Sequence, residues 1–296
     1  MKRIIGVMFG LAVFGFGAFL LVTQPRSIAP EQLAGLTGDP VQGEAVFWAA
    51  GCASCHAAED SSGDDRLILA GGQHFPSDFG TFTAPNISPD PNFGIGDWSL
   101  AEFVTAVQEG VSPEGQHYYP AFPYTAYHLA QTQDIVDLYA FMMTLPQDST
   151  PSQPHDVGFP FNIRRLVGGW KFLYVSDEFT LQGDLAQDVA RGRYLSEALA
   201  HCAECHSPRN LLGAIDSSAW LQGAPNPSGR GRIPDITPAE LGWSQADIAN
   251  YLRDGFTPSF DAAGGHMASV VQNLANLPDE DRMAIAAYLL AVPDAQ

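Results

Sequence analysis

The sequence predicts an all-α protein made of two tandem units with long loops, preceded by one N-terminal membrane helix. Three observations support this prediction. The chain begins with an uncharged apolar run, the remainder contains an internal repeat, and no sustained alternation of apolar and polar residues indicates β-strands. With 296 residues and 46% apolar composition, the chain is long enough to bury two ordinary cores.

The N-terminal segment has the length and composition of a membrane-spanning helix. Lys2 and Arg3 precede the run Ile4 to Val22, which contains only Gly, Ala and large apolar side chains. The apolar part of a signal peptide is shorter, about 7 to 15 residues, and ends at a small-x-small cleavage site. No such site follows at 19–25, so we favour an uncleaved anchor, with cleavage to a soluble protein as the alternative. Both place the rest of the chain outside the cytoplasm, because the two basic residues stay inside.

The rest of the chain contains two copies of one helical pattern. Ser99 and Ser244 each follow a tryptophan and are predicted N-caps, and Gly110 and Gly255 are predicted helix ends. A proline-flanked loop precedes each tryptophan, and an apolar-periodic helix closes each copy. The loops are at 85–89 and 234–238, and the closing helices are at 134–144 and 279–290. The repeat predicts two domains of the same fold.

Changes in composition divide the chain into five parts. These are an anchor or signal segment at 1–25, a tether at 26–38, a first domain at 39–146, an inter-domain segment at 147–186 and a second domain at 187–296. The inter-domain segment contains an apolar stretch at 159–170, which is too apolar for a free linker. We expect this stretch to pack across both domains.

All four cysteines fall in two Cys-x-x-Cys-His motifs, one in each domain. The first motif is formed by Cys52, Cys55 and His56, and the second by Cys202, Cys205 and His206. On one helical turn, two thiols at this spacing can add to the two vinyl groups of one haem, and the next imidazole can reach the iron. We therefore predict two covalently bound haem c groups, haem 1 and haem 2, with the two histidines as axial iron ligands.

Two other uses of paired cysteines fit the sequence less well. A redox dithiol does not need the histidine that follows both motifs, and it normally lies in a βαβ pattern that this sequence lacks. A zinc site needs four ligands that converge, whereas the two motifs lie in different domains.

The sixth iron ligand decides whether a haem only carries electrons or also binds small molecules. Met267, in a Gly-Gly-His-Met loop, is the predicted ligand of haem 2, with a core methionine as the alternative. The repeat register places Phe122 at the position of Met267, and phenylalanine cannot bind iron. His128 is therefore the candidate sixth ligand of haem 1, with a surface histidine as the alternative. Further candidates are His117, Met142 and Met143.

Several strings outside the cysteine motifs are typical of one family. They are 85–90 (PNISPD), 94–99 (GIGDWS), 119–124 (YPAFPY), 160–165 (PFNIRR), 191–195 (RGRYL) and 207–211 (SPRNL). With these strings the chain resembles the two-haem and multi-haem cytochrome c subunits of membrane-bound bacterial dehydrogenases, such as the alcohol dehydrogenase cytochrome subunit. The resemblance covers nearly all of the chain after the N-terminal helix. Many members have methionine at the position of Phe122, and others have it where this chain has Ala130, so this chain departs from the family at haem 1.

The resemblance implies two class I-like cytochrome c domains on the periplasmic side of the bacterial inner membrane. It implies a subunit that takes electrons from a periplasmic dehydrogenase and passes them to a quinone, a cytochrome or an oxidase. It also implies that Asn86, Asp235, Trp98 and Trp243 line the haem pockets, with loop caps and core aromatics as the alternative.

Two different functions are expected, depending on whether the sixth position of haem 1 is filled or open. The leading hypothesis is electron transfer without turnover of a substrate; a bis-histidine haem 1 would then have the lower potential and pass electrons to haem 2. The alternative is a dihaem peroxidase-like enzyme with an open sixth site on haem 1 and with His117 or Glu114 as acid/base group.

The charge of the chain narrows the choice of partners. The net charge is −19, from 33 acidic and 14 basic residues, and this excess would repel the phosphates of a nucleic acid. We expect a redox protein with a basic docking surface, the alternative being that the charge only keeps the chain soluble.

Overall fold

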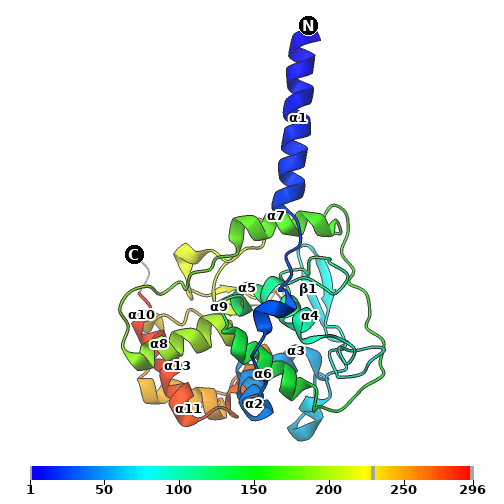
Figure 1. The fold of residues 1–296 in the computed structure, drawn as a ribbon. Helices are drawn as coiled ribbons and strands as arrows, with labels where there is room; N and C mark the ends of the chain where they lie inside the picture. Colours follow the sequence, from blue (N-terminus) through cyan, green and yellow to red (C-terminus); the bar gives the residue numbers. More distant parts are fainter. Residues whose placement is uncertain (1, 228–230, 294–296) are drawn as a thin grey trace.

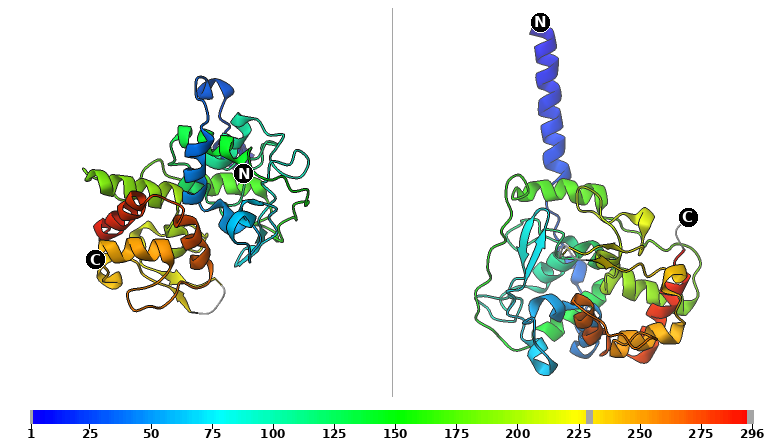
Figure 2. Two further views of the ribbon diagram at one scale, coloured as in Figure 1. Left: turned by 90° about the horizontal axis from the view of Figure 1, so that it is seen from below. Right: turned by 180° about the vertical axis from the view of Figure 1, so that it is seen from behind.

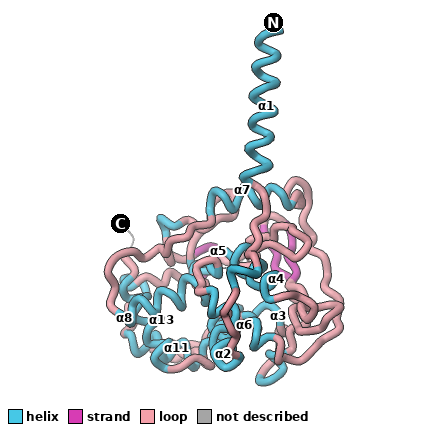
Figure 3. Tube along the Cα trace, viewed as in Figure 1, coloured by secondary structure: helices cyan, strands magenta, loops and turns pink. Residues whose placement is uncertain are grey.

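The computed structural model describes residues 2–227 and 231–293 as one projecting helix and a globular part with two lobes (Figure 1). Helix α1 (Lys2–Val22) projects alone and is long and apolar enough to cross a bilayer. Seen from below in Figure 2, the first and second halves of the chain form lobes that lie side by side. Helices and long loops make up most of the described chain (Figure 3), as the sequence predicted.

The first lobe is built on the crossing of α2 (Pro40–Ala49) and α6 (Thr132–Met142). The helices touch at Gly43, where a Cβ atom would lie 2.0 Å from the carbonyl oxygen of Asp137. Only glycine fits at this distance. The lobe also contains η1 (Pro30–Leu33), α3 (Cys52–His56), η2 (Gly63–Leu67), α4 (Leu100–Val104), the π-helical turn η3 (Thr105–Glu109) and α5 (Tyr124–Tyr127).

The second lobe repeats this crossing with α8 (Gln187–Arg193) and α13 (Asp279–Ala291). A Cβ atom on Gly192 would lie 1.8 Å from the carbonyl oxygen of Ala284, so glycine is again required. The lobe also contains the π-helical turn η4 (Tyr194–Leu199), α9 (Ala203–His206), η5 (Ser217–Ala219), α10 (Pro238–Leu241), α11 (Gln245–Asp254) and α12 (His266–Leu274).

The helix ends predicted from the repeat are those observed. Ser99 and Ser244 cap the helices that follow them, each accepting a hydrogen bond from the backbone three residues later. Gly110 and Gly255 end these helices in the left-handed conformation, with φ of 57° and 78°. The predicted closing helices are α6 and α13.

Two small antiparallel hairpins are additional to the predicted helices. Strand β1 (His74–Ser77) pairs with β2 (Gly80–Thr83), and β3 (Ala224–Pro225) pairs with β4 (Arg232–Ile233). Strands this short do not carry enough residues for an alternating pattern to stand out in the sequence.

The inter-domain segment forms helix α7 (Arg164–Tyr174), which lies across the base of α1 (Figures 1 and 2). On the side of the first lobe, Lys171 Nζ donates to the carbonyl oxygens of Glu109 and Gly110 at 2.5 and 2.7 Å. On the side of the second lobe, Trp170 Nε1 donates to the carbonyl oxygen of Leu212 at 2.9 Å. The segment therefore contacts both lobes.

Candidate haem-binding sites

The first cysteine motif forms a single helical turn, α3, which begins after Gly51 in the left-handed conformation (φ 69°). The turn carries Cys52, Cys55 and His56 close together. His56 Nδ1 lies 2.8 Å from the carbonyl oxygen of Pro85. Because a carbonyl can only accept, Nδ1 carries the hydrogen and Nε2 is left for a metal. Burial lowers the pKa of His56, which favours the neutral imidazole that binds metals.

The second motif has the same geometry in α9. His206 Nδ1 lies 2.8 Å from the carbonyl oxygen of Pro234, and burial lowers the pKa of His206 as well. Each of the two proline-flanked loops of the repeat therefore fixes the orientation of one imidazole.

The cysteines fit thioether attachment better than the alternatives. Burial raises the pKa of Cys52 to about 12 and that of Cys55 to about 11, whereas a redox dithiol needs a reactive thiolate. None of the four cysteines is in a disulfide. In the described part of the chain, no cluster of His, Cys, Asp and Glu has the geometry of a metal site, which disfavours zinc. Two neighbouring thiols and one oriented imidazole in each lobe fit one covalent haem.

The positions predicted for the sixth ligands differ in chemistry between the lobes. Met267 lies in the first turn of α12 and packs, partly buried, against the core. The ring of Phe122 also packs partly buried against the core, and its centroid lies 5.8 Å from those of Tyr118 and Tyr127. The assignment of Met267 to haem 2 stays a prediction.

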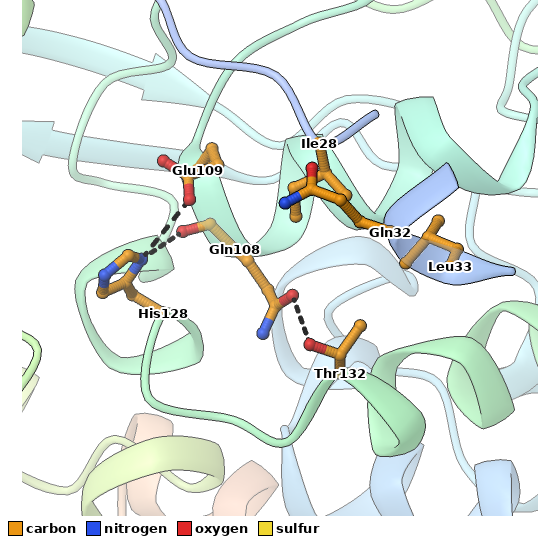
Figure 4. Close-up of a pocket in the computed structure, with 7 residues that line it drawn as sticks. All are labelled: Ile28, Gln32, Leu33, Gln108, Glu109, His128 and Thr132. Atoms are coloured by element: carbon orange, nitrogen blue, oxygen red, sulfur yellow. Dashed lines mark hydrogen bonds and ion pairs between the residues drawn. The ribbon is translucent and has the colours of Figure 1, made fainter. Parts of the chain in front are cut away.

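His128 has protein partners on both ring nitrogens. Nδ1 lies 3.0 Å from the carbonyl oxygen of Gln108, and Nε2 lies 2.6 Å from a carboxylate oxygen of Asp177. The imidazole lines a surface pocket of about 350 Å³, drawn in Figure 4. The pocket is lined by Ile28, Gln32, Leu33, Gln108, Glu109, His128 and Thr132. To bind iron, His128 would have to give up one of its two partners.

The other candidates lie elsewhere. His117 is buried, and its Nε2 lies 3.0 Å from the carbonyl oxygen of Thr23 at the end of α1. Glu114 is exposed, and Met142 is buried in α6. Met143, which follows α6, is partly buried against the core.

The polar residues predicted to line the haem pockets hold loops together. Asn86 Nδ2 donates to the carbonyl oxygens of Asp148 and Thr150 at 2.8 and 2.9 Å. Asp235 accepts from the backbone N–H of Thr237 at 2.8 Å. Both side chains therefore cap loops, and their lining of the haem pockets stays a prediction. The paired tryptophans, Trp98 and Trp243, are partly buried against the core.

The two attachment turns are held by side chains from the opposite lobes. Asn273 Nδ2, on α12, donates at 2.7 Å to Ser54, which lies between the two cysteines of the first motif. Thr125 Oγ1, on α5, donates at 3.0 Å to Glu204, which lies between the two cysteines of the second. Both turns therefore lie at the interface of the lobes.

His201 adds a third contact between the lobes. It precedes Cys202 directly, at the position that Gly51 has in the first motif, and it adopts the left-handed φ of 41°. This conformation costs a non-glycine residue roughly 1–2 kcal/mol. The imidazole lies near the backbone of Ala50 and packs against Tyr127, with ring centroids 5.7 Å apart. The pairing of His201 with Gly51 in the repeat is the sequence signal that could have identified it.

Arg66 is a buried cation at the same interface. From the first lobe, it donates to the side-chain oxygens of Gln272 and Asn273, both at 2.5 Å. Ser269 supplies further acceptors, and none of these partners is a carboxylate. A positive charge is therefore held against α12, the helix that carries Met267.

The fold and the two sites define a c-type cytochrome with two haem-binding domains. Residues 40–146 match the family model of cytochrome c, and residues 187–289 match that of subunit III of cbb3-type cytochrome c oxidase. The chain is 55% identical to a diheme cytochrome c-type protein of Cereibacter sphaeroides, over 99% of both chains. It therefore belongs to the dihaem cytochrome c family, and it binds two haem c groups.

Two relatives are longer subunits of dehydrogenases. Over 85% of this chain, identity is 39% to the fructose dehydrogenase cytochrome subunit of Gluconobacter japonicus. The chain is 31% identical, again over 85% of its length, to the cytochrome c subunit of the quinone alcohol dehydrogenase of Gluconobacter oxydans. The matched regions cover 52% and 54% of these relatives, about half their length.

Proposed function

We propose that the chain is an electron carrier that takes electrons from a periplasmic dehydrogenase and passes them to a quinone, a cytochrome or an oxidase. The observation that carries this proposal is that each attachment turn contacts the opposite lobe, where a side chain holds it. Such a contact suits transfer of electrons between the haems. The names of the relatives support a dehydrogenase as the donor.

In this proposal the protein supplies attachment and orientation. Cys52 and Cys55 would hold haem 1, and Cys202 and Cys205 would hold haem 2, through thioether bonds in which each thiol hydrogen would go to the second vinyl carbon. His56 and His206 bind iron through Nε2, because Pro85 and Pro234 hold Nδ1. When bound, each haem supplies an iron that alternates between the ferrous and ferric states. The fixed imidazoles and loops limit rearrangement as the charge of the iron changes.

The sixth ligands follow from the sequence. Met267 binds the iron of haem 2, where a thioether raises the reduction potential. His128 is the candidate for haem 1 and would exchange its contact with Asp177 or Gln108 for the iron.

Helix α1 and the net charge indicate where the carrier lies and what kind of surface it docks on. We propose that α1 anchors the chain in the inner membrane, with the lobes on the periplasmic side. The net charge of −19 favours a basic docking surface on the donor or the acceptor, and added salt would weaken that docking.

An optical redox titration of the purified holoprotein, repeated with carbon monoxide and with cyanide, tests the proposed function. We expect two one-electron steps and low-spin spectra that neither ligand changes. A high-spin haem that binds carbon monoxide and turns over hydrogen peroxide would contradict a pure carrier and favour the peroxidase-like alternative.

A further inference from the structure

We propose that α7 and two adjoining loops form a membrane-contact face, which seats the globular part of the chain on the lipid surface beside α1. The partner is the interfacial region of a bilayer, recognised by burial of apolar side chains rather than by charge. This proposal rests on the anchoring of α1 in the proposed function and adds a second contact with the same membrane.

The amphipathic character of α7 is the reverse of that of a helix on the surface of a soluble protein. Leu166, Phe172 and Leu173 point outward, and Phe172 and Leu173 are 68% and 64% exposed. Val167 and Gly168 are buried in the protein. A soluble surface helix normally presents polar side chains to water.

The charged side chains of α7 are turned toward the protein. Arg164 donates to the carbonyl oxygen of His117 at 3.1 Å, and Lys171 donates to carbonyl oxygens of the first lobe. Arg165 donates to Thr23 Oγ1 at 2.7 Å and to the carbonyl oxygen of Leu20. The outward face of the helix is therefore left apolar.

The junction between α7 and α1 fixes the orientation of this face. At Gly168 a Cβ atom would lie 2.6 Å from the carbonyl oxygen of Thr23, so the chain at the end of α1 touches the backbone of α7. Thr23 is buried there, and its carbonyl oxygen also meets His117 Nε2 at 3.0 Å. If α1 crosses a bilayer, α7 lies crosswise at the point where the chain leaves it (Figures 1 and 2). Amphipathic helices bind in this interfacial zone.

Two loops extend the apolar face beside α7. Leu211 and Leu212 are 98% and 54% exposed, and the carbonyl oxygen of Leu212 accepts the hydrogen bond from Trp170. Phe159 and Phe161, just before α7, are also exposed. Exposed apolar side chains of α7 and of the two loops therefore lie near the base of α1. Lipid fits this surface better than a protein partner because the surface adjoins the membrane helix itself.

Site-directed spin labelling of the full-length holoprotein in phosphatidylcholine nanodiscs tests the proposal. Since haem attachment consumes all four cysteines, an added cysteine is the only free thiol. The variants are Leu173→Cys on the proposed face, Phe14→Cys in α1 and Asn250→Cys on α11, which lies on the far side of the lobes from α1 (Figure 1). We expect the labels at positions 173 and 14 to lose most of their access to a water-soluble nickel complex while oxygen still reaches them. The label at 250 should stay accessible to nickel.

The labels at the three positions distinguish failure of the membrane-contact face from failure of the anchoring of α1. If nickel reaches the label at 173 as freely as that at 250 while the label at 14 is protected, α1 is anchored but the membrane-contact face is refuted. If nickel also reaches the label at 14, anchoring itself fails. Protection of the label at 173 only after a dehydrogenase is added would assign the face to a protein partner and overturn the proposal. Redox titration of the same samples reports on electron transfer separately.

Discussion

His201 adopts an unfavourable backbone conformation, and its ring packs against the opposite lobe. Its counterpart in the repeat is Gly51, which takes the left-handed conformation without strain. The ring of His201 reaches Tyr127 and the backbone of Ala50 in the opposite lobe. The hydroxyl of Tyr127 donates to the carbonyl oxygen of Ala50, at 2.8 Å.

Replacing His201 with glycine separates the backbone conformation from the contact. We expect His201→Gly to relieve roughly 1 kcal/mol of backbone strain, which offsets part of the lost packing. The rate of electron transfer between the haems, measured after flash photoreduction, should fall. Tyr127→Phe, which keeps the ring and removes one hydrogen bond, should lower the rate less. An unchanged rate in His201→Gly would show that the imidazole does not hold the turns together.

The sixth ligand of haem 1 is tested by one substitution. If His128 binds iron, His128→Ala will give haem 1 a high-spin spectrum and a site for carbon monoxide, because alanine cannot bind the iron. Optical and electron paramagnetic resonance spectra measure the change, and Asp177→Ala serves as the control that keeps the imidazole. Unchanged spectra in His128→Ala would show that His128 does not bind iron and keeps its contacts with Gln108 and Asp177 in the holoprotein.

Glu197 introduces a pH dependence into the stability of the second lobe. Its carboxylate accepts from Tyr288 Oη at 2.8 Å and from the backbone N–H of Leu181 at 3.1 Å. Burial raises the pKa of Glu197 above its ordinary value of 4.5. The folded state therefore favours the neutral acid, and this contribution to stability is lost as pH rises through the raised pKa.

Glu197→Gln should remove that dependence. Between the ordinary and the raised pKa, the stability of the wild type relative to the variant should decline by at most about 1.4 kcal/mol per pH unit. Urea unfolding of both proteins across this range measures the difference. A constant difference would show that the carboxyl group titrates alike in the folded and unfolded chains.

The two helix crossings show how closely the helices of each lobe are packed. Each depends on one glycine, Gly43 or Gly192, facing a carbonyl oxygen of the closing helix. A methyl group there would force the helices apart, since the backbone of the partner helix cannot move aside as a side chain can.

Gly192→Ala should therefore destabilise the protein by about 1–3 kcal/mol or more, as overpacking of a core does. Chemical denaturation of the holoprotein measures the loss. Gly158→Ala is the matched control, because a Cβ atom at that loop position would meet no atom within 4 Å. Equal stability of the two variants would contradict the assigned role of the crossing.

At the scale of the whole molecule, Arg66 links the lobes and carries a charge between them. A buried positive charge near a haem stabilises the ferrous state and so raises the reduction potential. Arg66→Met should therefore lower at least one of the two potentials, whereas Arg66→Lys should keep most of the effect. Spectroelectrochemical titration measures both values. If the lysine and methionine variants shift the potentials equally, the role of Arg66 lies in its hydrogen bonds rather than its charge.

The sequence predicted those features that depend on neighbouring residues. The attachment turns, the caps at Ser99 and Ser244 and the glycine ends of helices are local, and the repeat supplied a second copy of each. The contacts of Asn273 with Ser54 and of Arg66 with α12 join residues more than 200 positions apart. No local pattern reveals such pairs. Likewise, the apolar stretch at 159–170 was visible in the sequence, but the side of α7 that faces outward depends on the tertiary fold.

Both attachment turns are supported by side chains of the opposite lobe. His201 and Asn273, both from the second lobe, hold the first turn and the residues just before it. In return, Thr125 of the first lobe donates to Glu204 in the second turn. A fragment that contained the first lobe alone would lack the supports from the second lobe, so we expect its attachment turn to be held less firmly than in the whole chain.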